Sequence, residues 1–101
     1  MRMILQVKTP NEPFNTYVKD GSAGKRIQKI LEETKPEAAY FTEIGGQRSA
    51  ILIIDLADAS KIPSLVEPWF LTFNATCELS VAMTPEDLGK SGIDTIGKRW
   101  G

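Results

Sequence analysis

The chain has 101 residues, the size of one domain, and its 12 basic and 13 acidic residues give a net charge of −1. This near-neutral balance argues against a nucleic-acid partner, because such proteins usually carry a basic face. The chain has no histidine, which excludes Ser-His-Asp and Cys-His catalysis and His-ligated zinc. Its single cysteine, Cys77, excludes an internal disulfide and a thiolate cluster. The sequence therefore predicts neither a metal nor a cofactor.

The first residues do not resemble a targeting signal, because charged side chains at Arg2 and Lys8 leave no room for the apolar segment of a signal peptide. No apolar run approaches the roughly 20 residues of a membrane span. We therefore expect a cytoplasmic protein with no membrane partner.

The first strand is predicted at residues 2–8, where Met3, Leu5 and Val7 alternate with polar side chains. A helix is predicted from about residue 12 to residue 34, because apolar and small residues recur there at three- and four-residue steps. Gly21 and Gly24 interrupt that face, and each costs ~1 kcal/mol relative to alanine inside a helix. We expect one helix with a weak middle, the alternative being a break at the glycines.

A β-hairpin is predicted from residues 37–44 and 47–56, because Gly45-Gly46 between two β-rich runs is typical of a tight turn. This turn places Glu43 opposite Arg48, and opposite charges there support the register. Residues 50–54 are apolar without alternation, which predicts a central strand covered on both faces.

A second helix is predicted after Ser60, a candidate N-cap, with Pro63 in its first turn. Its apolar residues follow the i, i+3, i+4, i+7 pattern, and Pro68 is expected to kink it.

The last strand is predicted at residues 75–83, and Thr84-Pro85 reads as the start of a further helix. Residues 1–88 are expected to form one domain. Residues 89–101 are expected to form a C-terminal tail that packs on this domain or on a partner subunit.

The order of elements predicts an α+β fold of the ferredoxin-like βαββαβ type, with a four-stranded antiparallel sheet and two helices on one face. The helices can cover only one sheet face, although the strand at residues 47–56 is apolar on both. A second copy of the sheet is the simplest cover, so we expect a homodimer.

The layout resembles the dimeric α+β barrel superfamily over residues 2–88, with an arrangement similar to muconolactone isomerases and to an uncharacterised bacterial family. The resemblance lies in the glycine turn, in Ile54-Asp55-Leu56, in the run from Glu67-Pro68-Trp69-Phe70, and in the segment from Val81 to Pro85. It implies a dimeric barrel. Superfamily members often use a histidine that this chain lacks, so no mechanism transfers residue by residue.

Glu43 and Arg48 are the leading polar candidates, because they share a sheet face with Phe41, Ala50 and Leu52. Arg48 could bind a carboxylate or enolate, and Glu43 could accept a proton. The alternative is an ordinary solvent-exposed hairpin ion pair.

Further candidates are aromatic. Phe14, Tyr17 and Tyr40 could line an apolar pocket, and Glu67 beside Trp69 could have a raised pKa. The alternative is that the aromatic residues are core and that Glu67 lies on the polar side of a helix.

Two functions remain open. The first is a barrel that binds a small apolar, aromatic or carboxylate ligand at Phe14, Tyr17, Tyr40, Glu43, Arg48, Glu67 and Trp69. The second, which the superfamily resemblance implies, is a cofactor-independent isomerase or monooxygenase of small organic acids or aromatics that uses Glu43 and Arg48.

Overall fold

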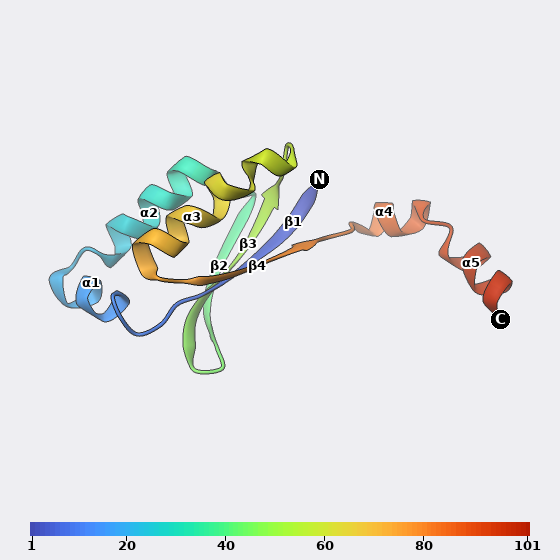
Figure 1. Cartoon of the computed structure of the whole chain (residues 1–101). Coiled ribbons are helices and arrows are strands. Elements are labelled where there is room, and N and C mark those ends of the chain that lie inside the picture. The colour runs from blue at the N-terminus through green and yellow to red at the C-terminus, as the bar shows by residue number, and fades with distance from the viewer.

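The structure, a computed structural model that describes residues 1–101, is an α+β fold with a four-stranded antiparallel sheet (Figure 1). The elements follow one another as β1 (Arg2–Lys8), α1 (Phe14–Asp20), α2 (Ala23–Thr34), β2 (Ala38–Ile44), β3 (Gln47–Asp55), the 3₁₀ turn Ala59–Lys61, α3 (Ile62–Phe73), β4 (Thr76–Val81), α4 (Pro85–Lys90) and α5 (Ile93–Trp100).

The strands lie in the order β2-β3-β1-β4, so β3 is central, as its continuous apolar run predicts. The predicted hairpin register is confirmed, with Glu43 opposite Arg48 and Ile44 opposite Gln47. Gly45 and Gly46 form the turn with φ of 61° and 81°. Two consecutive positive φ values suit glycine, and their twist matches that of the flanking strands.

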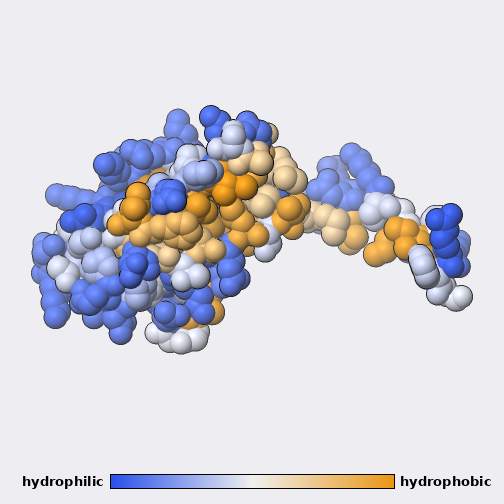
Figure 2. Space-filling model, in the orientation of Figure 1, coloured by the Kyte–Doolittle hydropathy of each residue, from blue (hydrophilic) through white to orange (hydrophobic).

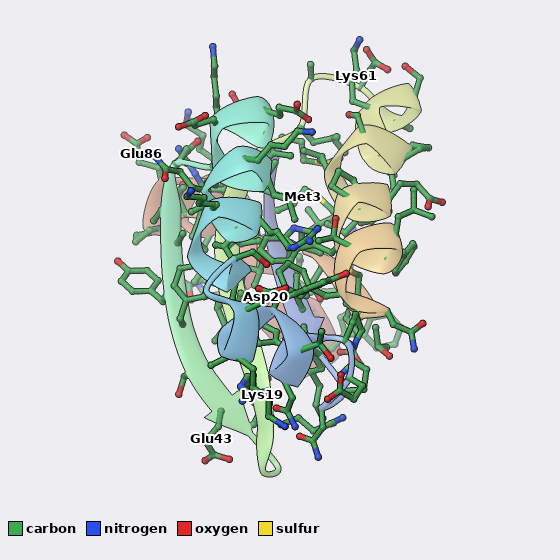
Figure 3. All side chains as sticks on the ribbon, turned by 90° about the vertical axis from the view of Figure 1, so that its left-hand side faces the viewer. Met3, Lys19, Asp20, Glu43, Lys61 and Glu86 are labelled. Carbon is green, nitrogen blue, oxygen red and sulfur yellow. The ribbon has the colours of Figure 1, made fainter.

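Helices α1, α2 and α3 cover one face of the sheet (Figure 1). The core lies between these two layers, where Met3 sits behind the helices in Figure 3. Its most deeply buried large side chains are Trp69, Phe73, Leu5, Leu52 and Val7.

No helix covers the opposite face of the sheet (Figure 1), which we call the open face. Ile4 lies there opposite Ile53, and Tyr40 lies opposite Ile51. The two β3 isoleucines are half-buried, but Ile4 is 37% exposed and Tyr40 is 64% exposed. Apolar side chains therefore meet solvent on this face.

The predicted continuous helix over residues 12–34 is wrong, because the chain forms two helices that meet at Gly21. Gly21 ends α1 in the left-handed conformation, with φ of 81°. Asp20 Oδ1 then accepts a hydrogen bond from the Ser22 N–H at 2.9 Å, which stabilises the turn into α2.

The predicted N-cap at Ser60 is also wrong, because α3 begins after Lys61, which makes no side-chain cap hydrogen bond. A 3₁₀ turn precedes α3 and is capped by Asp58, whose carboxylate accepts a hydrogen bond from the Ser60 N–H. Pro63 lies in the first turn of α3, as predicted, and the helix continues through Pro68 to Phe73.

The helix start at Thr84-Pro85 is confirmed. Thr84 and Asp87 form a capping box, in which each side chain accepts a hydrogen bond from the other residue's backbone N–H.

The C-terminal helices α4 and α5 project away from the sheet and from helices α1–α3 (Figure 1). Their projection lengthens the molecule to 59 × 29 × 19 Å and gives a radius of gyration of 16.9 Å. A compact chain of this length would have about 13 Å. We expected residues 89–101 to pack either on the chain's own domain or on a partner subunit. The structure does not show the first of these two arrangements. None of the helices is both long and apolar enough to cross a membrane.

Candidate functional site

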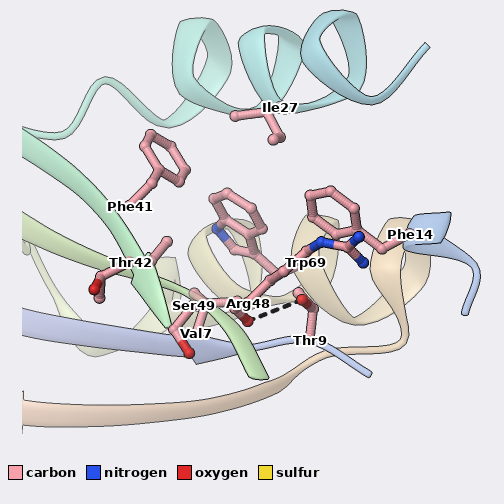
Figure 4. A pocket seen from close by; sticks show the side chains of 10 residues that line it. Val7, Thr9, Phe14, Ile27, Phe41, Thr42, Arg48, Ser49 and Trp69 are labelled. Carbon is pink, nitrogen blue, oxygen red and sulfur yellow. Dashed lines mark hydrogen bonds between the residues drawn. The ribbon is translucent and has the colours of Figure 1, made fainter. Parts of the chain in front are cut away.

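A cavity of about 240 Å³ lies between the sheet and the helices, at the end of the sheet nearest α1 (Figure 4). Six of its ten lining residues are apolar, so it favours an apolar ligand body. The lining residues are Val7, Thr9, Phe14, Ile27, Phe41, Thr42, Arg48, Ser49, Ala50 and Trp69.

The aromatic wall of the cavity is fixed by the core. Phe14 packs on Phe73 with ring centroids 4.9 Å apart, and Trp69 stacks on the same ring at 5.9 Å. Because Phe73 is fully buried, these contacts hold Phe14 and Trp69 in place.

Arg48 supplies the cation of the cavity. Its guanidinium lies over the Phe14 ring, 4.6 Å from the centroid, and its Nη1 donates a hydrogen bond to Asn15 Oδ1 at 2.7 Å. The backbone is also held, since the Arg48 carbonyl accepts hydrogen bonds at 2.9 Å from both the N–H and the hydroxyl of Thr9 (Figure 4). Arg48 is thus a positioned cation with further guanidinium N–H groups available to an anion.

Trp69 supplies a buried neutral donor. The residue is 2% exposed, and its indole Nε1–H has no hydrogen-bond partner. In Figure 4 the nitrogen is on the edge of the indole that faces Phe41 and Thr42. A buried polar group without a partner costs about 1–3 kcal/mol, and a ligand oxygen that displaces the side chains covering this nitrogen would remove that cost.

Glu43 does not join Arg48 at this site. Its Oε2 accepts a hydrogen bond from the Gly46 N–H at 2.7 Å, and no ion pair joins it to Arg48. Figure 3 shows Glu43 at the end of the β2–β3 hairpin, pointing away from the helices. The expected acid–cation pair is therefore not formed, because the carboxylate instead binds the turn that follows it.

The remaining predicted site residues are dispersed. Tyr17 packs edge-on against Phe73, with Arg26 stacked 3.8 Å above its ring, and does not line the cavity. Tyr40 lies on the open face. Glu67 lines a separate open groove between α2 and α3, together with Arg26 and Lys29. Of the seven predicted residues, the structure brings Phe14, Arg48 and Trp69 together at one cavity.

Sequence reasoning missed Thr9, Asn15 and Ile27. Ile27 is on the apolar stripe of its helix, but no pattern says that this position borders a cavity rather than filling the core. Thr9 and Asn15 flank the β1–α1 loop, and their contacts with Arg48 span more than 30 residues of sequence. Phe41 was correctly placed beside Ala50 by the hairpin register.

Cys77 lies outside the cavity, half-buried on β4. Burial raises the pKa of its thiol to about 11, which opposes formation of the nucleophilic thiolate. No group of three His, Cys, Asp or Glu side chains is placed to hold a metal ion.

The sequence matches no protein-family model and no curated protein. Among solved structures, the chain is similar to the de novo designed protein Ferredog-Diesel, with 12% sequence identity and a TM-score of 0.49. The match covers 80% of this chain and 85% of that chain.

Proposed function

We propose that this protein binds a small aromatic or apolar compound that carries a carboxylate and a second oxygen acceptor. The cavity holds the apolar body, Arg48 binds the carboxylate, and the Trp69 Nε1–H donates to the second oxygen. The unpartnered indole N–H carries the proposal, because this donor is deeply buried at the wall of an apolar cavity.

The proposal concerns binding and assigns no reaction. Glu43, the base of the isomerase or monooxygenase alternative, is bonded to the turn and does not line the cavity. No observation therefore favours the catalytic alternative over binding.

The proposed assembly is a homodimer in which two ferredoxin-like sheets pack through their open faces into an α+β barrel. The strand order and the exposed Ile4 and Tyr40 of the open face support it. A second copy would cover the apolar side chains that the helices leave in contact with solvent.

Indole ¹H–¹⁵N NMR spectra test the binding proposal, because the chain has two tryptophans and a Trp100→Phe variant assigns the Trp69 signal. The probes are 4-acetylbenzoate, which has both oxygen groups, and 4-ethylbenzoate, which lacks the ketone. We expect saturable binding of both compounds. The Trp69 indole proton should shift downfield with 4-acetylbenzoate but not with 4-ethylbenzoate.

The matched variants are Arg48→Met and Lys25→Met, which remove one cation at the cavity and one exposed cation on α2. Arg48→Met should weaken binding of 4-acetylbenzoate by about tenfold or more, since a hydrogen bond to a charged group contributes about 1.5–3 kcal/mol. Lys25→Met should leave affinity unchanged. Absence of saturable binding by both probes, or equal weakening by both variants, would contradict the proposal.

A further inference from the structure

The C-terminal arm, defined as residues 83–101, leaves the domain through a very short connection. The sheet extends to Ala82, whose N–H donates to the Arg2 carbonyl at 2.9 Å. The capping box begins at Thr84, so Met83 alone separates the two fixed points. A one-residue connection gives the arm little freedom to fold back over its own sheet.

The two helices of the arm are too short to be stable in water without a packing partner. They contain six and eight residues, whereas isolated helices shorter than about 12–15 residues are marginal. Each also contains a glycine, Gly89 or Gly97, which weakens it further. Helix formation in the arm therefore requires contact with another surface.

The arm presents an apolar stripe suited to such a contact. Ile93, Ile96 and Trp100 share one face of α5 at helical spacing, and they are 54%, 51% and 82% exposed. Leu88 adds a further exposed apolar side chain on α4. Figure 2 shows apolar atoms on the arm, which projects beyond the main body.

The charges of the arm favour a protein partner over a membrane. Its three acidic residues, Glu86, Asp87 and Asp94, balance its three basic residues, Lys90, Lys98 and Arg99. Helices that lie on anionic membranes instead carry an excess of Lys and Arg on their polar face. A balanced polar face suits the surface of a near-neutral protein, and this chain has a net charge of −1.

We propose that the arm packs against a second copy of this chain, so that two copies exchange their arms across a twofold interface. The open face and the arm are two apolar surfaces that one copy leaves uncovered, and one symmetric dimer covers both. This inference rests on the proposed homodimer and adds the segment that secures it.

Isotope-filtered NMR on the full chain tests the exchange directly. A dimer sample is prepared from equal amounts of ¹³C-labelled and unlabelled chains, and only contacts between different copies are recorded. We expect NOEs from the Ile93 and Ile96 methyl groups and the Trp100 ring to residues 1–82 of the other copy.

A matched pair of variants measures what the arm contributes. Ile96→Asp places a charge on the apolar stripe, and Thr95→Asp places the same charge on the polar side of the same helix. Sedimentation equilibrium should show that Ile96→Asp weakens the dimer by about tenfold or more, while Thr95→Asp changes it less than about twofold.

The possible outcomes distinguish a failure of the arm exchange from a failure of the proposed homodimer. A dimer without arm contacts between copies, or one unaffected by Ile96→Asp, overturns the exchange and leaves the face-to-face dimer intact. A monomer at all concentrations overturns both the exchange and the proposed homodimer.

Discussion

Glu43 and Arg48 are direct neighbours across the β2–β3 ladder, yet their side chains bind in different directions. Glu43 accepts the Gly46 N–H of the hairpin turn, whereas Arg48 reaches Asn15 at the start of α1. A residue pair that reads as an ion pair in the sequence is thus divided between a structural role and a place at the cavity.

This division predicts unequal effects of substitution. Glu43→Gln keeps an acceptor for the Gly46 N–H and should change the affinity for 4-acetylbenzoate by less than about twofold, because Glu43 does not line the cavity. Arg48→Met should cause the large loss given above. Calorimetric titration measures both, and a loss with Glu43→Gln as large as with Arg48→Met would show that the carboxylate takes part in binding.

Substitutions at Phe73 and Leu71 test the packing of the core. Both residues lie on α3, but Phe73 is fully buried and Leu71 is 82% exposed. Phe73→Ala should lower the free energy of unfolding by about 3–5 kcal/mol, because it removes a ring that Phe14, Tyr17 and Trp69 all contact. Leu71→Ala should change it by less than about 0.5 kcal/mol. Urea unfolding provides the measurement, and similar losses for the two variants would contradict the assigned packing.

The raised pKa of the Cys77 thiol predicts that the folded chain loses stability at alkaline pH. Burial raises its pKa from the ordinary 9.0 to about 11 in the folded chain. Between these values the unfolded chain binds fewer protons than the folded chain, so stability falls as pH rises from about 9 towards 11. Urea unfolding at a series of pH values should show this fall in the wild type, and Cys77→Ala should lack it. An equal fall in the variant would assign the effect to other groups.

The lowered pKa of Asp87 predicts that the start of α4 loses stability at acidic pH. Hydrogen bonds from the backbone and side chain of Thr84 hold its pKa below the ordinary value of 3.8. The charged carboxylate therefore stabilises the start of α4 above pH 3.8, and this contribution is lost as pH falls through the lower folded value. ¹³Cα chemical shifts of residues 85–90 should report the loss, and Asp87→Asn should make them insensitive to pH in that range. Unchanged pH sensitivity in the variant would exclude Asp87 as the cause.

Much of the architecture is readable from local patterns. The glycine pair set the hairpin register, and the unbroken apolar run identified β3 as central. The break at Gly21 was harder to place, because a glycine inside a helical pattern is compatible with either a weak helix or a left-handed end. Here the Asp20 carboxylate accepts a hydrogen bond from the Ser22 N–H, which favours a left-handed end of α1 at Gly21. This contact exists only once the turn has formed.

The site was less predictable because it depends on contacts distant in sequence. Phe14 and Trp69 were identified as aromatic, but aromatic residues serve core and cavity equally well. What distinguishes them is the unfilled space beside Ile27 and the unpartnered Trp69 nitrogen. The unfilled space and the unpartnered nitrogen both depend on how the three helices pack against the sheet, which no local sequence pattern specifies.

The central position of β1 also governs the order in which the chain can be assembled. Seven of its residues pair with β3 on one side and six pair with β4 on the other, and β1 and β4 lie near opposite ends of the domain in sequence. Until β4 has been synthesised, one edge of β1 carries unpaired backbone groups that can pair with another chain. High contact order of this kind slows folding, so nascent chains would spend longer in a state open to mispairing.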